Sequence, residues 1–173
     1  SWNPEDMLKL LQTEGDVVCG TYRFKTDEEE YMGDVYGTKD LQPVMRADGC
    51  MDSIQMPAGF LKVTARGISK FMRGYPELCY GHPYHLSVDL FNHGAHQGTW
   101  YGEDYAFCRN WRALGEKVWL IPDLNITHHS KDKAFPGNYA QFLERQRAAT
   151  EKHLPSGPGA PINLFEQRGL SAA

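Results

Sequence analysis

The first 22 residues place a helix directly before a buried strand, and this order constrains the fold more than any other feature of the chain. Residues 3–6 (NPED) supply an N-cap asparagine, a proline for the first turn and two acids, which is a helix start. The apolar segment within residues 16–22 then predicts a strand. The chain is therefore expected to start inside an αβ unit with no strand before its first helix, which is unusual for a complete α/β domain because a crossover helix normally joins two strands. Four apolar side chains form the predicted buried face of the helix: Met7, Leu8, Leu10 and Leu11.

A second helix is predicted to follow two adjacent acids, Glu103 and Asp104. Apolar residues recur at helical spacing as far as Leu114, and Gly115 is expected to end the helix. Free backbone N–H groups at a helix start stabilise carboxylate anions, so the pair suits a general base or an acceptor of sugar hydroxyls. Simple capping of the helix is the alternative explanation.

The remaining patterns predict short strands that alternate with two further helices. Strands are expected over residues 50–56, 59–64, 117–121 and 124–127, and helices from Thr64 or Ala65 to Gly74 and over 138–150. Residues 31–48 are expected to hold one or two short strands, and residues 76–99 a polar surface loop with one strand over 86–91. This pattern predicts one α/β domain over residues 1–150, followed by a Pro/Gly-rich tail over 151–173.

Charge and composition exclude several classes of partner. The net charge of −4 argues against nucleic-acid binding through a basic surface. No apolar run approaches the roughly 18 to 20 residues of a membrane span, so no integral membrane span is expected. Four widely separated cysteines predict buried thiols and a reducing, cytoplasmic location; they are Cys19, Cys50, Cys79 and Cys108.

Six of the seven histidines fall in two regions that suggest metal ligation. Two HxxH pairs lie seven residues apart between residues 82 and 96, and a metal-dependent hydrolase that combines them with Glu103 and Asp104 is one hypothesis. A loop that binds an acceptor or simply faces solvent is the alternative. His128 and His129 end a predicted strand, where structural histidines are the alternative to metal ligands. The paired histidines are His82, His85, His93 and His96.

Three stretches, taken in order, resemble the second half of a GT-A glycosyltransferase of the family 2-like kind. The resemblance spans roughly residues 1–145, and its third stretch is the most specific. It implies an α/β fold with a partial GT-A-like mixed sheet flanked by helices. The stretches are SWNPEDMLKLLQTEGDVVCGTY, MDSIQMPAGFLKVTARGISKFMRGYP and YGEDYAFCRNWRALGEKVWLIPDLNITHHS.

The resemblance implies transfer of a sugar from a nucleotide-sugar donor to an acceptor hydroxyl, with inversion. Asp104 would be the catalytic base and Glu103 would hold sugar hydroxyls, with the two roles open to exchange. His128 would ligate Mn²⁺ or Mg²⁺, with His129 in reserve. Four further residues would bind substrate: Gly59, Phe60, Trp100 and Tyr101.

The sequence departs from the family in having no Asp-x-Asp motif, which holds the metal and the diphosphate in such enzymes. We therefore expect a truncated piece of a longer protein, which need not be active without its nucleotide-binding half. A missing half would leave a sheet edge and an apolar face exposed, so self-association into a homo-oligomer is expected. A non-catalytic, self-associating module is accordingly the third hypothesis.

Overall fold

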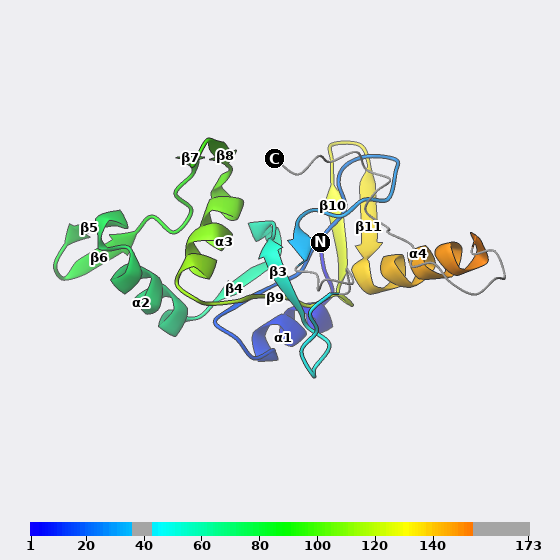
Figure 1. Cartoon of the computed structure of the whole chain (residues 1–173), viewed down its shortest axis with the longest axis horizontal. Coiled ribbons are helices and arrows are strands. Elements are labelled where there is room, and N and C mark those ends of the chain that lie inside the picture. Colours follow the sequence, from blue (N-terminus) through cyan, green and yellow to red (C-terminus); the bar gives the residue numbers. More distant parts are fainter. Residues whose placement is uncertain (36–42, 154–173) are drawn as a thin grey trace.

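The computed structural model describes residues 1–35 and 43–153, which form a mixed α/β protein (Figure 1). Within this part of the chain, four helices are found: α1 (Pro4–Gln12), α2 (Ala65–Gly74), α3 (Glu103–Ala113) and α4 (Tyr139–His153). The main sheet has the order β2-β3-β9-β1-β4. Its strands are β1 (Val17–Cys19), β2 (Asp34–Val35), β3 (Met51–Gln55), β4 (Leu61–Val63) and β9 (Val118–Leu120).

Three two-stranded hairpins accompany the main sheet. They pair β5 (Cys79–His82) with β6 (His85–Val88), β7 (Gly94–His96) with β8 (Thr99–Tyr101), and β10 (Asn125–His129) with β11 (Ala134–Asn138). In Figure 1 the first two hairpins lie on the side of α2 and α3, and the third lies beside α4. The α/β class predicted from the sequence is confirmed.

Strand β9 lies at the centre of the sheet and runs parallel to its neighbour β1, with Cys19 opposite Leu120. The other neighbours in the sheet are antiparallel, and Leu61 at the start of β4 also pairs with Cys19. The carboxyl ends of β1 and β9 and the turn before β4 therefore meet at one edge of the sheet. Ligands of α/β proteins commonly bind at such an edge.

The sheet separates two hydrophobic clusters, because successive strand residues point to opposite faces. Val17 and Cys19 belong to one cluster, which α2 and α3 complete through Phe71 and Trp111. Val18 belongs to the other cluster, which contains Leu10 of α1. The core is therefore layered, with helices on both faces of the sheet.

Helix α1 begins as expected, but its predicted buried face is wrong at two positions. Pro4 opens the helix, and the Asp6 carboxylate accepts the backbone N–H of Asn3. Leu10 is buried, whereas Leu8 and Leu11 are 54% and 57% exposed. A short helix that packs on one small sheet buries a single i, i+3 stripe, and Leu8 and Leu11 lie on the neighbouring stripe.

The predictions for α2 and α3 are confirmed by their caps and their packing. The Thr64 hydroxyl accepts the N–H of Gly67 at 3.0 Å, which caps α2. Trp111 of α3 is fully buried and donates its indole N–H to the carbonyl oxygen of Lys117 at 3.0 Å. Gly115 follows α3 with φ of 80°, a conformation that glycine adopts without strain.

The region between α2 and α3 differs from the prediction of a loop with one strand. It forms the β5–β6 and β7–β8 hairpins, in which polar and aromatic side chains predominate.

Further along, β10 extends to His129, so both His128 and His129 lie within a strand. Strand β11 was not predicted, and the Asn138 side chain caps α4 by accepting the N–H of Gln141 at 3.2 Å.

All four cysteines are free, and three of them are buried, which agrees with the thiols expected from their spacing. Across the described residues, none of the helices is both long enough and apolar enough to cross a membrane. The predicted tail lies outside the described residues from position 154 onward, as do residues 36–42 of the predicted 31–48 strand region.

Candidate functional site

The candidate site lies beside the carboxyl end of β1 and the turn that leads into β4. Tyr22 follows the carboxyl end of β1 by three residues, and residues Ala58–Phe60 form a 3₁₀ turn directly before β4. The backbone N–H of Gly59 donates to the Tyr22 hydroxyl oxygen at 3.2 Å. A Cβ atom added at Gly59 would lie 2.4 Å from that oxygen. Only glycine therefore allows this approach of the turn to Tyr22.

Asp104 reaches the same turn from the first turn of α3. One carboxylate oxygen accepts the N–H of Tyr105 at 3.0 Å, and the other accepts the N–H of Ala58 at 3.4 Å. These two N–H groups, one in α3 and one in the turn before β4, hold the Asp104 carboxylate in place. Burial and the negative charge of Asp104 both raise the pKa of Tyr22, which the Gly59 N–H partly opposes. The phenol is therefore protonated at neutral pH.

His128 packs against the other side of Tyr22, with ring centroids 4.8 Å apart in an edge-on arrangement. Its Nδ1 lies 2.8 Å from the carbonyl oxygen of Arg23. A carbonyl oxygen can only accept, so the proton of the neutral ring lies on Nδ1 and the Nε2 lone pair remains for a ligand. Asp104 and His128 are thus joined through the Gly59 turn and Tyr22.

His129 is not part of this cluster. Neighbouring residues of a strand point to opposite faces, and His129 is exposed, with Nε2 at 2.9 Å from the hydroxyl of Ser1. Glu103 is also exposed at the start of α3, next to Asp104 in the chain. The two members of each adjacent pair, Glu103 and Asp104 as well as His128 and His129, therefore lie in different surroundings.

Of the four predicted substrate-binding residues, Gly59 is the one that contacts Tyr22. Phe60 is 3% exposed and packs against Trp2 in the core, at 5.1 Å between ring centroids. Trp100 is 69% exposed on β8. Tyr101 lies beneath the guanidinium of Arg109, at 4.6 Å from the ring centroid.

The four histidines of residues 82–96 are divided between two hairpins. His82 and His85 face each other across the turn of β5–β6, while His93 and His96 belong to the β7–β8 region. The His82 Nδ1 accepts the backbone N–H of Tyr84 at 3.4 Å, which leaves its proton on Nε2, the nitrogen that would otherwise ligate a metal.

A complete metal site is not formed by the described residues. No group of three or more His, Cys, Asp or Glu side chains comes together within residues 1–35 and 43–153 in a way that could hold an ion. Mn²⁺ and Mg²⁺ prefer several oxygen ligands, whereas His128 offers one nitrogen. The residues present therefore do not fit a self-contained Mn²⁺ or Mg²⁺ site, although His128 has the tautomer of a single ligand.

The sequence did not identify Tyr22 as a site residue. Its signal was the position directly after a buried strand, at the edge of an α/β sheet where ligands bind. The contact with His128 and with Gly59 depends on segments more than 35 residues away, which a local pattern does not reveal.

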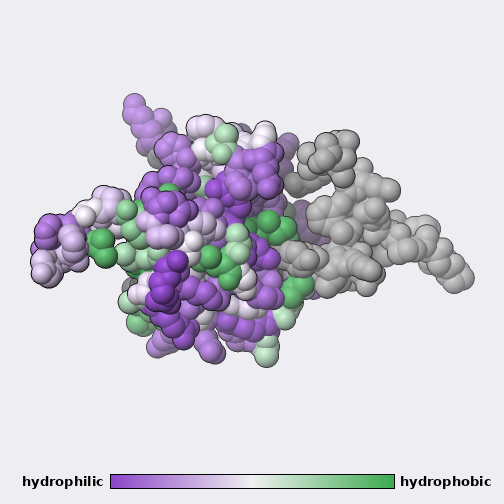
Figure 2. All heavy atoms as spheres, turned by 60° about the vertical axis from the view of Figure 1, so that its left-hand side comes forward, coloured by the Kyte–Doolittle hydropathy of each residue, from purple (hydrophilic) through white to green (hydrophobic). Residues whose placement is uncertain are grey.

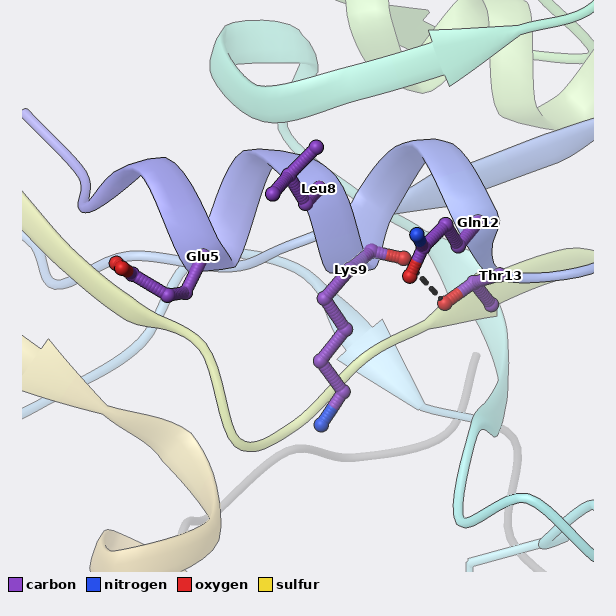
Figure 3. A pocket seen from close by; sticks show the side chains of 5 residues that line it. All are labelled: Glu5, Leu8, Lys9, Gln12 and Thr13. Carbon is purple, nitrogen blue, oxygen red and sulfur yellow. Dashed lines mark hydrogen bonds between the residues drawn. The ribbon is translucent and has the colours of Figure 1, made fainter.

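Two shallow hollows open elsewhere on the described surface. One lies on the outer side of α1, where Leu8 and Lys9 project and the Thr13 hydroxyl donates to the Lys9 carbonyl oxygen (Figure 3). The other lies over the β10–β11 hairpin and the start of α4. Neither is lined by Tyr22, Asp104 or His128.

Comparison of the chain with protein-family models, with curated proteins and with solved structures found no match.

Proposed function

We propose that this chain is a glycosyl-transfer domain with a partial GT-A-like fold, in which Asp104 accepts the proton of an acceptor hydroxyl. One observation carries the proposal: Asp104 and His128 both converge on the Tyr22–Gly59 contact. These residues belong to the stretches whose order and motifs resemble the second half of such enzymes. Their convergence near the carboxyl ends of β1 and β9 supports a shared binding site, because ligands of open α/β sheets bind outside the carboxyl ends of the strands.

The proposed reaction transfers a sugar from a nucleotide sugar to a hydroxyl group. The acceptor oxygen attacks the anomeric carbon while its proton moves to the Asp104 carboxylate. The bond between that carbon and the phosphate oxygen breaks, and its electron pair leaves with the nucleoside diphosphate. Attack from the opposite side inverts the anomeric configuration. A positioned base of this kind contributes about 10² to 10⁴ in rate.

We assign the proton-accepting role to Asp104 and the binding of sugar hydroxyls to Glu103. Asp104 contacts the Gly59 turn through Ala58, whereas Glu103 is exposed beside it. Trp100 and Tyr101, which precede the two acids, are proposed to contact the same sugar. His128 is proposed as one ligand of Mn²⁺ or Mg²⁺, and no step of the reaction above depends on that ion.

The test is the release of nucleoside diphosphate from a set of nucleotide sugars, with and without neutral sugar acceptors. We expect Asp104→Asn to lower the rate by at least about 100-fold, which is the lower range for loss of a general base. Glu103→Gln is the matched control, because it neutralises the adjacent acid, and it should have the smaller effect. Wild-type activity in Asp104→Asn would overturn the proposal.

Exposed apolar side chains favour a second candidate, a self-associating module. Leu8 and Leu11 of α1 are more than half exposed, and Trp2 is 48% exposed nearby in the chain. Figure 2 shows apolar patches that interrupt an otherwise hydrophilic surface. A second copy of the chain is the proposed partner, because covering such side chains removes apolar surface from water.

A further inference from the structure

The hydroxyl group of Tyr22 carries a donor proton that none of the described residues accepts. Its oxygen accepts the N–H of Gly59 at 3.2 Å, in a bond exposed to solvent. A phenol also donates one proton. Among the hydrogen bonds found within residues 1–35 and 43–153, none has the Tyr22 hydroxyl as its donor. The donor is therefore available to a ligand that approaches the site.

The position of this hydroxyl is held from two sides. The edge-on contact with His128 restrains the ring, and the Gly59 turn approaches so closely that no Cβ fits between them. A fixed donor of this kind binds a ligand oxygen with little loss of side-chain entropy.

We propose that Tyr22 is a substrate-binding residue whose hydroxyl donates a hydrogen bond to a ligand oxygen held between Asp104 and His128. This inference rests on the proposed glycosyl transfer and adds a residue to it. The ligand oxygen belongs either to the nucleotide sugar or to the acceptor sugar, and both present the same acceptor to a phenol. The experiment below separates these two sources.

The test is nuclear magnetic resonance of wild-type protein that carries ¹³C-labelled tyrosine. It follows the ζ-carbon signal of Tyr22, which is assigned by its loss in Tyr22→Phe. Uridine, guanosine and thymidine diphosphate sugars are added in one arm, and neutral disaccharides in the other. We expect the Tyr22 signal to shift in the arm whose ligand it contacts. Tyr22→Phe should weaken binding of that ligand by about three- to tenfold, as expected for one neutral hydrogen bond.

Two further variants separate ligand contact from a merely structural role. Tyr75→Phe removes another partly buried hydroxyl, which donates to the Asn110 carbonyl oxygen at 2.9 Å, and should leave ligand affinity unchanged. Gly59→Ala keeps the Tyr22 hydroxyl but displaces it, and should weaken binding as Tyr22→Phe does. If Tyr22 only supported the turn, Tyr22→Phe would lower the melting temperature without changing ligand affinity in the folded protein.

The outcomes distinguish this inference from the proposed function. If wild-type protein binds a ligand and Asp104→Asn abolishes transfer, but the Tyr22 signal and the affinity of Tyr22→Phe stay unchanged, the inference is wrong and the proposed function stands. If no ligand of either arm binds and no transfer occurs, both are wrong.

Discussion

Nη1 of Arg112 on α3 lies 2.6 Å from a carboxylate oxygen of Asp52 on β3. The Asp52 side chain is 4% exposed. The same guanidinium nitrogen donates to the carbonyl oxygen of Ser53 at 2.6 Å. Lys117 approaches the second oxygen of Asp52 at 2.8 Å. The buried Asp52 carboxylate therefore attaches α3, the helix that carries Asp104, to the main sheet.

We expect Arg112→Met to destabilise the fold, because it leaves the buried carboxylate of Asp52 with Lys117 as its remaining cation. A buried charge left without any partner costs about 3 to 5 kcal/mol, and Lys117 at 2.8 Å should keep the loss below that range. Urea denaturation followed by circular dichroism measures the free energy of unfolding. Arg66→Met is the matched control: Arg66 pairs with Asp16 but its side chain is 79% exposed, so the loss should be smaller. Equal losses in the two variants would contradict this account.

Tyr31 predicts how stability changes at alkaline pH. Burial, followed by the charge of Glu29, raises the pKa of Tyr31 to about 12 from its usual value of 10. Above pH 10 the unfolded chain loses this proton while the folded protein retains it, so stability falls as pH rises from 10 to 12. The measurement is the free energy of unfolding at several values in that window. Tyr31→Phe should show a shallower loss, and an identical slope would exclude this residue as the cause.

The helices could be predicted from the sequence because their ends carry local signals. Pro4, Thr64 and Gly115 each act at a helix end where the sequence placed them. The strands of the hairpins were harder to predict. Their composition does not show a strand pattern, and it is the pairing of the two strands that holds them in the extended conformation. Strand β11 contains Pro136 and Gly137, which break a strand pattern but are tolerated in a two-stranded ribbon with an open edge.

The candidate site was predictable in part for the same reason. Gly59, Asp104 and His128 occur in recognisable motifs, and the structure brings them together around Tyr22. The motif predicts that Phe60 contacts the substrate, whereas in the structure the ring is 3% exposed and lies in the core. The position of a side chain within a turn depends on tertiary packing, which the motif does not specify.

The exposed leucines of α1 predict self-association. We expect light scattering to detect a dimer or larger species of the wild-type chain, and Leu8→Gln with Leu11→Gln to shift it toward the monomer. Glutamine keeps nearly the helix propensity of leucine, so α1 should persist. Glu5→Gln on the same helix is the control and should leave the oligomeric state unchanged. A wild-type monomer over the whole concentration range would rule out the second copy as partner.

If the proposed function is right, the tautomer of His128 predicts that this residue, and not His129, is the histidine ligand of the divalent ion. Nδ1 of His128 donates to the Arg23 carbonyl oxygen and leaves Nε2 for coordination, whereas His129 directs Nε2 to Ser1. We expect electron paramagnetic resonance to show weaker Mn²⁺ binding in His128→Ala and unchanged binding in His129→Ala, which is the matched control. Because His128 is a single ligand, added nucleoside diphosphate should strengthen Mn²⁺ binding by supplying phosphate oxygens. Equal Mn²⁺ affinity in wild type and His128→Ala, with and without the diphosphate, would remove His128 from the proposed site and leave the assignment of Asp104 to be judged by transfer alone.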